Sequence, residues 1–133
     1  MENTINLKTG LRCEKTETVT HENTALAWGS GGLPVYATPA MAALMEMASA
    51  AAVAAELPKG FSTVGTELNI KHLAATPPGM EIRAVAELIK TEGRRLLFRV
   101  EAFDGAGKIG EGVHGRFIVE DERFMQKAAK RGT

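Results

Sequence analysis

Apolar side chains recur at every second position through most of the second half of the chain, in four runs separated by turn residues. The runs cover residues 62–74, 82–88, 96–102 and 109–119, and the turns between them fall at residues 76–79, 92–93 and 104–105. Such alternation is typical of strands that bury one face. A looser alternation, rich in Thr and Val, covers residues 11–20. The pattern therefore predicts five strands.

Between residues 40 and 55 the alternation of apolar and polar positions stops, because nearly every position is Ala, Met, Leu or Val. Thr38 followed by Pro39 is typical of a helix start, with a hydroxyl residue as N-cap and proline in the first turn. We expect one long helix that begins at Thr38 and is buried on most of its sides. No other stretch predicts a helix able to cover it, so the sheet must do so. The stretch is short for a membrane span and contains Glu46.

The predicted order is one strand, one long helix and four strands. A meander of long strands curled around one apolar helix is the hotdog arrangement, so we expect an α+β fold in which a curved antiparallel sheet wraps the helix. We expect residues 1–133 to form a single hotdog domain, with a short C-terminal helix after the last strand. Such a sheet leaves an edge that commonly pairs with a second copy, which predicts a C2 homodimer and permits higher oligomers.

Composition removes several classes of function. Sixteen Lys and Arg residues balance sixteen Asp and Glu residues, so no net positive field attracts nucleic acid or an anionic membrane. Cys13 is the lone cysteine, which excludes an internal disulfide and a cysteine-based metal site, and is typical of a reducing compartment. The N-terminus has no secretory pattern, so we expect a cytoplasmic protein. No phosphate loop, metal-ligand spacing or dinucleotide motif implies a cofactor or metal.

Three residues on or beside the predicted helix form a candidate catalytic set. Thr38 places a hydroxyl at the positive end of the helix, although capping alone would explain it. Glu46 is the only ionisable residue between Thr38 and Ala55. A buried carboxylate is costly, so Glu46 either has a partner or lies on an exposed stripe of the helix. His72 alternates with Leu68 and Ile70 on the face that the helix must cover, where a hydrogen-bonded core histidine is the commoner outcome. Hydroxyl, carboxylate and imidazole together are the groups that acyl transfer needs.

Three further residues on the strands are candidates of second rank. Gly65 lies inside a strand, where glycine indicates either a bulge or the close approach of a backbone or ligand. His114 and Arg116 share one face of the last strand, and either a ligand or solvent explains them. The segment 29–32, Gly-Ser-Gly-Gly, is a connecting turn or a lid.

Two segments carry a family resemblance: Val35-Tyr36-Ala37-Thr38 followed by Leu44-Met45-Glu46, and Gly65-Thr66 followed by the run from His72 to Gly79. With these residues the chain resembles the fluoroacetyl-CoA thioesterase-like family of hotdog proteins, from about Val35 to Val119. The resemblance implies a dimeric thioesterase whose Thr, Glu and His triad corresponds to Thr38, Glu46 and His72. It also implies that Gly65 and Arg116 contact substrate. The chain departs from the family before Thr38, where Gly31-Gly32-Leu33 replaces a Phe-bearing lid.

The expected activity is hydrolysis of a small or medium acyl-CoA thioester, or of another pantetheine thioester, to the acid and free thiol. Thr38 either attacks the carbonyl or orients a water that Glu46 activates, because both schemes use the same residues. Two alternatives remain on the same fold. One is an enoyl-CoA hydratase or dehydratase, which needs an acid and a base but no hydroxyl at Thr38. The other is a non-catalytic acyl-CoA binding protein.

Overall fold

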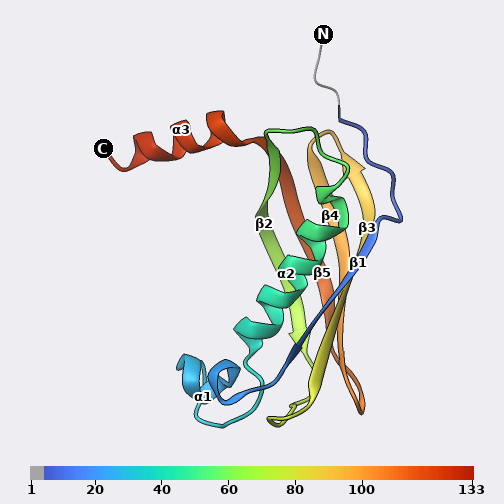
Figure 1. Ribbon diagram of the computed structural model, residues 1–133, viewed down its shortest axis with the longest axis vertical. Helices are drawn as coiled ribbons and strands as arrows, with labels where there is room; N and C mark the ends of the chain where they lie inside the picture. The colour runs from blue at the N-terminus through green and yellow to red at the C-terminus, as the bar shows by residue number, and fades with distance from the viewer. Residues whose placement is uncertain (1–4) are drawn as a thin grey trace.

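The structure, a computed structural model, describes residues 5–133. Its elements are β1 (Arg12–Thr18), the 3-10 turn η1 (His21–Asn23), α1 (Ala25–Trp28), α2 (Thr38–Ala54), β2 (Phe61–His72), β3 (Glu81–Glu92), β4 (Arg95–Asp104), β5 (Gly107–Glu120) and α3 (Asp121–Arg131) (Figure 1). The predicted order of strand, long helix and four strands is confirmed, as is the C-terminal helix. Two short helical turns, η1 and α1, precede the Gly-rich segment that the sequence marked as irregular.

The five strands form one antiparallel sheet in the order β1-β3-β4-β5-β2. Figure 1 shows α2 lying across one face of this curved sheet, while α3 projects away from it beyond β2. Strands β1 and β2 are the two edges, and β2 offers an edge of 12 residues without a neighbouring strand among residues 5–133. The turns predicted at residues 92–93 and 104–105 are the β3–β4 and β4–β5 hairpins.

One face of α2 and the inward faces of β3 and β4 make the core. Met41, Leu44 and Met45 are fully buried on the helix. The predicted alternation in β3 and β4 is confirmed, because the inward residues Ile82, Ala84, Ala86, Leu88, Leu96, Phe98, Val100 and Ala102 are all buried.

The opposite face of α2 is apolar but is not covered. Ala42, Ala43, Ala50 and Ala51 are half-buried, and Met47 is 50% exposed. The expectation that the helix would be buried on most of its sides is therefore wrong for the single chain, because the sheet reaches only one side. An apolar helix face left in water is the usual sign of a further packing partner.

The predicted alternation in β2 and β5 is wrong in phase, because each strand contains an irregularity. In β2 the register shifts between Gly65 and Glu67, so the residues before the shift face the opposite side from the one that alternation assigns. In β5 the shift lies opposite Ala102 and Phe103. Consequently Val64 pairs with the exposed Phe117 on the outer face, whereas the buried face of β5 carries His114, Arg116 and Ile118.

The start of α2 also differs from the prediction in one respect. The helix does begin at Thr38, but the N-cap is Ala37, which offers no side-chain hydrogen bond, and Pro39 occupies the second helical position. Thr38 is thus the first helical residue rather than the cap. Its hydroxyl is free for another partner, and the first N–H groups of α2 are not satisfied by a capping side chain.

No helix within residues 5–133 is long and apolar enough to cross a membrane.

Candidate active site

Thr38 and His72 meet where the start of α2 lies beside the end of β2. Thr38 Oγ1 is 2.7 Å from His72 Nδ1. The phase of β2 after its bulge turns Leu68, Ile70 and His72 toward α2, as the sequence predicted for these three residues. A hydroxyl in direct hydrogen bond with an imidazole is the arrangement that activates a nucleophile or holds a water. The two ends of these elements therefore bring together two of the three predicted residues.

The ring of His72 is enclosed by its neighbours. Its Nε2 is buried and has no hydrogen-bond partner among the residues that the structure describes. The ring of Tyr36 packs edge-on against it, with centroids 6.5 Å apart and planes at 84°. Burial lowers the pKa of His72 below its ordinary value, although the backbone of Ala74 partly opposes this. The imidazole is therefore neutral near pH 7 and able to accept a proton.

Tyr36 is itself fixed from the other side. Its hydroxyl donates to a carboxylate oxygen of Glu17 on β1, and its side chain is 1% exposed. Burial first, and then the Glu17 carboxylate, raise the pKa of Tyr36 above its usual range, so the phenol stays protonated. Sequence reasoning did not single out Glu17 or Tyr36, since a buried Tyr beside a strand glutamate has no distinctive spacing.

A pocket of about 280 Å³ opens at the Thr38–His72 pair. It is lined by Ala25, Ser30, Val35, Tyr36, Thr38, His72, Leu73, Ala74 and Ala75. Ser30 belongs to the Gly-rich segment, which therefore borders this pocket. Nearby Leu33 and Leu73 are largely exposed and leave the rim apolar. Such a pocket suits a small group with an apolar part and one reacting polar centre.

Glu46 lies with a second group of residues, away from Thr38. It follows Thr38 by eight positions, roughly 12 Å along a helix axis. Its negative charge acts on His114 and Arg116 of β5. Within residues 5–133 its side chain makes no hydrogen bond or ion pair. The single chain thus places Thr38 with His72, and Glu46 with His114 and Arg116.

Gly65 lies beside this second group at the β2 bulge. A Cβ added to Gly65 would be 3.3 Å from His114 Cε1 and 3.5 Å from Arg116 Nη1. The bulge is confirmed, and the groups that lie close to Gly65 are side chains of β5, whereas contact with a ligand stays a prediction. His114 is buried, so the solvent-facing explanation for it is wrong. The sequence signal for its burial is that His114 alternates with Ile118 on one face of β5. The irregularity opposite Ala102 and Phe103 conceals that alternation.

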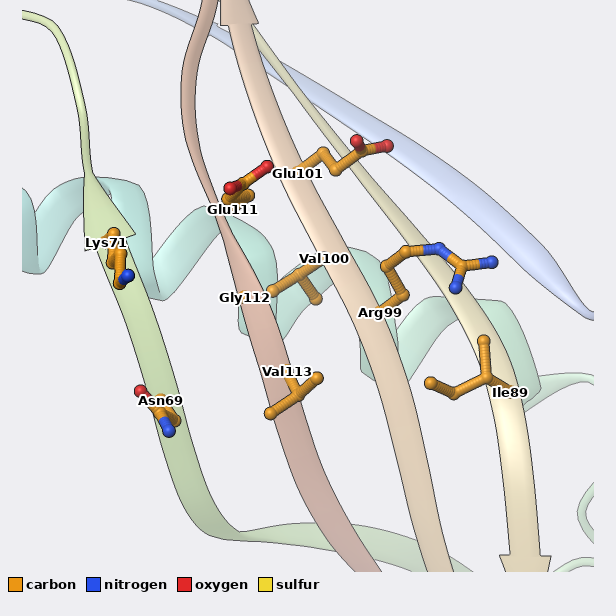
Figure 2. Close-up of a pocket in the computed structure, with 9 residues that line it drawn as sticks. All are labelled: Asn69, Lys71, Ile89, Arg99, Val100, Glu101, Glu111, Gly112 and Val113. Carbon is orange, nitrogen blue, oxygen red and sulfur yellow. The ribbon is translucent and has the colours of Figure 1, made fainter.

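A larger hollow, about 400 Å³, lies elsewhere, on the outer face of the sheet (Figure 2). Figure 2 shows Asn69, Lys71 and Arg99 among its lining residues, with α2 behind the strands. Its carboxylates Glu101 and Glu111 are already paired with Lys108. No hydroxyl–imidazole or similar reacting pair lines it, so we assign the chemistry to the smaller pocket at Thr38. Residues 5–133 contain no group of three His, Cys, Asp or Glu side chains placed to hold a metal ion.

Comparison with known proteins identifies the family. A family model described as fluoroacetyl-CoA-specific thioesterase matches residues 19–122. The chain belongs to this family. The fluoroacetyl-CoA thioesterase of Streptantibioticus cattleyicolor is 43% identical over 97 residues, which is 73% of this chain and 70% of that protein. The matched segment of the fluoroacetyl-CoA-specific thioesterase family includes all five predicted site residues.

Solved structures agree with the family assignment. The fluoroacetyl-CoA thioesterase FlK superposes with a TM-score of 0.86 at 36% identity, covering 94% of this chain and 97% of that one. A Thermus thermophilus hypothetical protein, described as a thioesterase superfamily member, gives a TM-score of 0.85 at 33% identity over 95% and 96% of the two chains. The hotdog fold predicted from the order of elements is confirmed.

Proposed function

We propose that this protein hydrolyses a small or medium acyl-CoA thioester, with water, to the carboxylic acid and free CoA. The observation that carries the proposal is the 2.7 Å contact between Thr38 Oγ1 and His72 Nδ1 in a pocket at the start of α2. Family membership supports the reaction class, and the relative from Streptantibioticus cattleyicolor is a fluoroacetyl-CoA thioesterase. The lone Cys13 favours a cytoplasmic location, and residues 1–133 are read as one domain of the enzyme.

In the proposed mechanism the thioester carbonyl lies at the N-terminus of α2. The free N–H groups of its first turn stabilise the negative charge that develops on the carbonyl oxygen. Neutral His72 takes the proton of the Thr38 hydroxyl as Oγ1 attacks the carbonyl carbon, and the C–S bond breaks to release the CoA thiol. Glu46 then removes a proton from the water that hydrolyses the acyl-Thr38 ester. Arg116 and Gly65 contact the acyl part of the substrate.

This mechanism needs a second copy of the chain, because Glu46 lies about 12 Å along the helix from Thr38. The open edge of β2 and the uncovered face of α2 both support an interface with a second copy. Two β2 strands that pair antiparallel about a two-fold axis place the His72 end of each beside the Gly65 half of the other. Thr38 and His72 of one protomer then face Glu46 and Arg116 of its partner in a homodimer.

Thiol release from a panel of acyl-CoA esters, from acetyl and fluoroacetyl to aromatic and medium chains, tests the function. We expect turnover of at least one ester and a loss of roughly 100-fold or more in kcat for Glu46→Gln, which keeps the shape but removes the base. Mass spectrometry of a rapidly quenched reaction should find the acyl group on Thr38; unmodified protein during turnover would favour direct attack by water. Tight binding of esters without thiol release from any of them would overturn the hydrolase in favour of an acyl-CoA binding protein.

A further inference from the structure

His114 on β5 is held by two neighbours of opposite hydrogen-bonding character. Its side chain is 1% exposed. Nδ1 is 2.8 Å from the backbone oxygen of Glu67, which can only accept, so Nδ1 carries the proton. Nε2 is 3.2 Å from Nη1 of Arg116, which can only donate, so Nε2 is the acceptor. These contacts select one neutral tautomer of the imidazole.

The guanidinium of Arg116 is fixed at three points. Nε donates to Thr63 Oγ1 and Nη2 to the Thr63 backbone oxygen, each at 2.8 Å, and Nη1 donates to His114. A guanidinium has five N–H groups, so one on Nη1 and one on Nη2 remain without a partner from these contacts. Within residues 5–133 no carboxylate forms an ion pair with Arg116, and Glu46 acts on it only through its field. The group is a preorganised donor with its charge available.

We propose that His114 is a positioning residue, which holds Arg116 so that its two remaining N–H groups bind the acyl part of the substrate and, after hydrolysis, the carboxylate of the product. This inference rests on the proposed thioester hydrolysis and adds the residue that orients its Arg116. A neutral imidazole is suited to this role because it accepts a hydrogen bond from the guanidinium and leaves the positive charge of Arg116 in place. A carboxylate at the same position would neutralise that charge. Gly65 contributes by leaving room for the ring, since a Cβ there would press on His114 Cε1.

Two substitutions separate the two hydrogen bonds of the ring. His114→Asn keeps a short amide able to donate to the Glu67 oxygen but loses the acceptor at the position of Nε2. His114→Gln reaches that position with its carbonyl oxygen and restores the acceptor for Arg116. We expect His114→Asn to raise KM for acyl-CoA roughly 10-fold or more, with a smaller change in kcat, and His114→Gln to recover most of the loss. Far-ultraviolet circular dichroism of both variants controls for folding.

The control for a merely structural effect is a double-mutant cycle with Arg116→Ala. If His114 acts through Arg116, His114→Asn changes KM little in the Arg116→Ala background. Equal effects of His114→Asn in both backgrounds, or failure of a folded His114→Gln to recover KM, would overturn the proposal.

A spectroscopic measurement of the His114 tautomer needs neither turnover nor a variant, so its result is independent of the test for hydrolase activity. Long-range ¹H–¹⁵N correlation spectra of the natural protein near pH 7 should show His114 neutral, with the proton on Nδ1. Signals of an Nε2–H tautomer or an imidazolium would overturn the positioning role even if the enzyme hydrolyses thioesters. The predicted spectrum together with inactive protein would instead retain the His114–Arg116 contact and reject the hydrolase.

Discussion

His72, which is half-buried, and His114, which is buried, differ in the hydrogen-bond partners of their ring nitrogens. His114 has both nitrogens engaged, by the Glu67 oxygen and by Arg116. Nδ1 of His72 lies beside Thr38 Oγ1, whereas its Nε2 is left without a partner among the described residues. A buried nitrogen without a partner is costly, so it persists where a substrate or a proton transfer uses it. We therefore propose His72, the ring with the unpartnered nitrogen, as the proton carrier, and His114, whose two nitrogens are both engaged, as the support of Arg116.

The pH dependence of turnover follows from the burial of His72. Burial lowers its pKa below the ordinary 6.5, so the neutral base persists to more acidic pH than a free imidazole would allow. We expect kcat/KM to be constant near neutrality and to fall as the pH drops through the lowered pKa of His72. A pH–rate profile measures this, with the acidic limb lying below pH 6.5. An acidic limb centred above that value would contradict the assignment of His72 as the base.

Stability responds to the same group with a definite sign. Because the pKa of His72 is lower in the folded chain, the unfolded chain binds a proton first as the pH falls. The contribution of neutral His72 is fully present above pH 6.5 and is lost between that value and the folded pKa. His72→Asn should abolish this part of the pH dependence in urea unfolding, whereas His21→Asn, at an exposed position in η1, should leave it unchanged.

At the scale of elements, the sequence predicts those strands whose buried stretches are regular, since the shift in β3 lies between Leu88 and Lys90, after its buried residues. In β3 and β4 the inward residues alternate as expected, because their buried stretches carry no extra residue. Strands β2 and β5 each contain a register shift, and one inserted residue moves every later side chain to the other face. Nothing in a period-two pattern marks that insertion except a glycine at residue 65. The inward position of His114 and Arg116 therefore had to come from the structure, whereas His72 lies after the β2 bulge and was placed correctly.

Gly65 gives a test of the bulge. Gly65→Ala would bring a methyl group within 3.3 Å of His114 Cε1, and the two hydrogen bonds of that ring leave it little freedom to move. We expect the free energy of unfolding to fall by about 1–3 kcal/mol and KM for acyl-CoA to rise. Urea denaturation and steady-state kinetics measure the two effects. Gly32→Ala is the matched control, since a Cβ there meets no atom within 4 Å; equal behaviour of the two variants would refute the account of the bulge.

At the scale of the whole molecule, the single chain leaves an apolar helix face and a sheet edge uncovered, and it does not bring the three proposed catalytic residues together. The helix α2 is apolar on every side, but the sheet covers one face, and Met47 on the other face is 50% exposed. The strand β2 is an open edge of the sheet. The sequence predicted an apolar helix in need of cover and a sheet edge in need of pairing. It did not predict how the site residues divide, because that depends on which strand residues lie beside Thr38 and which lie beside Glu46.

Met47 tests whether the uncovered face of α2 is an interface. Met47→Lys places a charge where we propose that two helices pack, so we expect monomers at concentrations where the natural protein is dimeric, with a matching loss of turnover. Analytical ultracentrifugation measures the association. Met125→Lys is the control, because Met125 lies on α3, is 62% exposed and is outside the proposed interface. A Met47→Lys variant that sediments as the natural protein does would exclude this face from the interface.

Complementation between two inactive variants asks directly whether the site is shared. Thr38→Ala and Glu46→Gln each disable both sites of their own homodimer. If Thr38 of one protomer works with Glu46 of its partner, a mixed dimer of the two variants has one site without either group and one intact site. An equal mixture, exchanged to equilibrium, holds half of its chains in mixed dimers, so it should recover about a quarter of natural activity. If both residues act from the same chain, every site in the mixture lacks one group, and no activity returns at any mixing ratio.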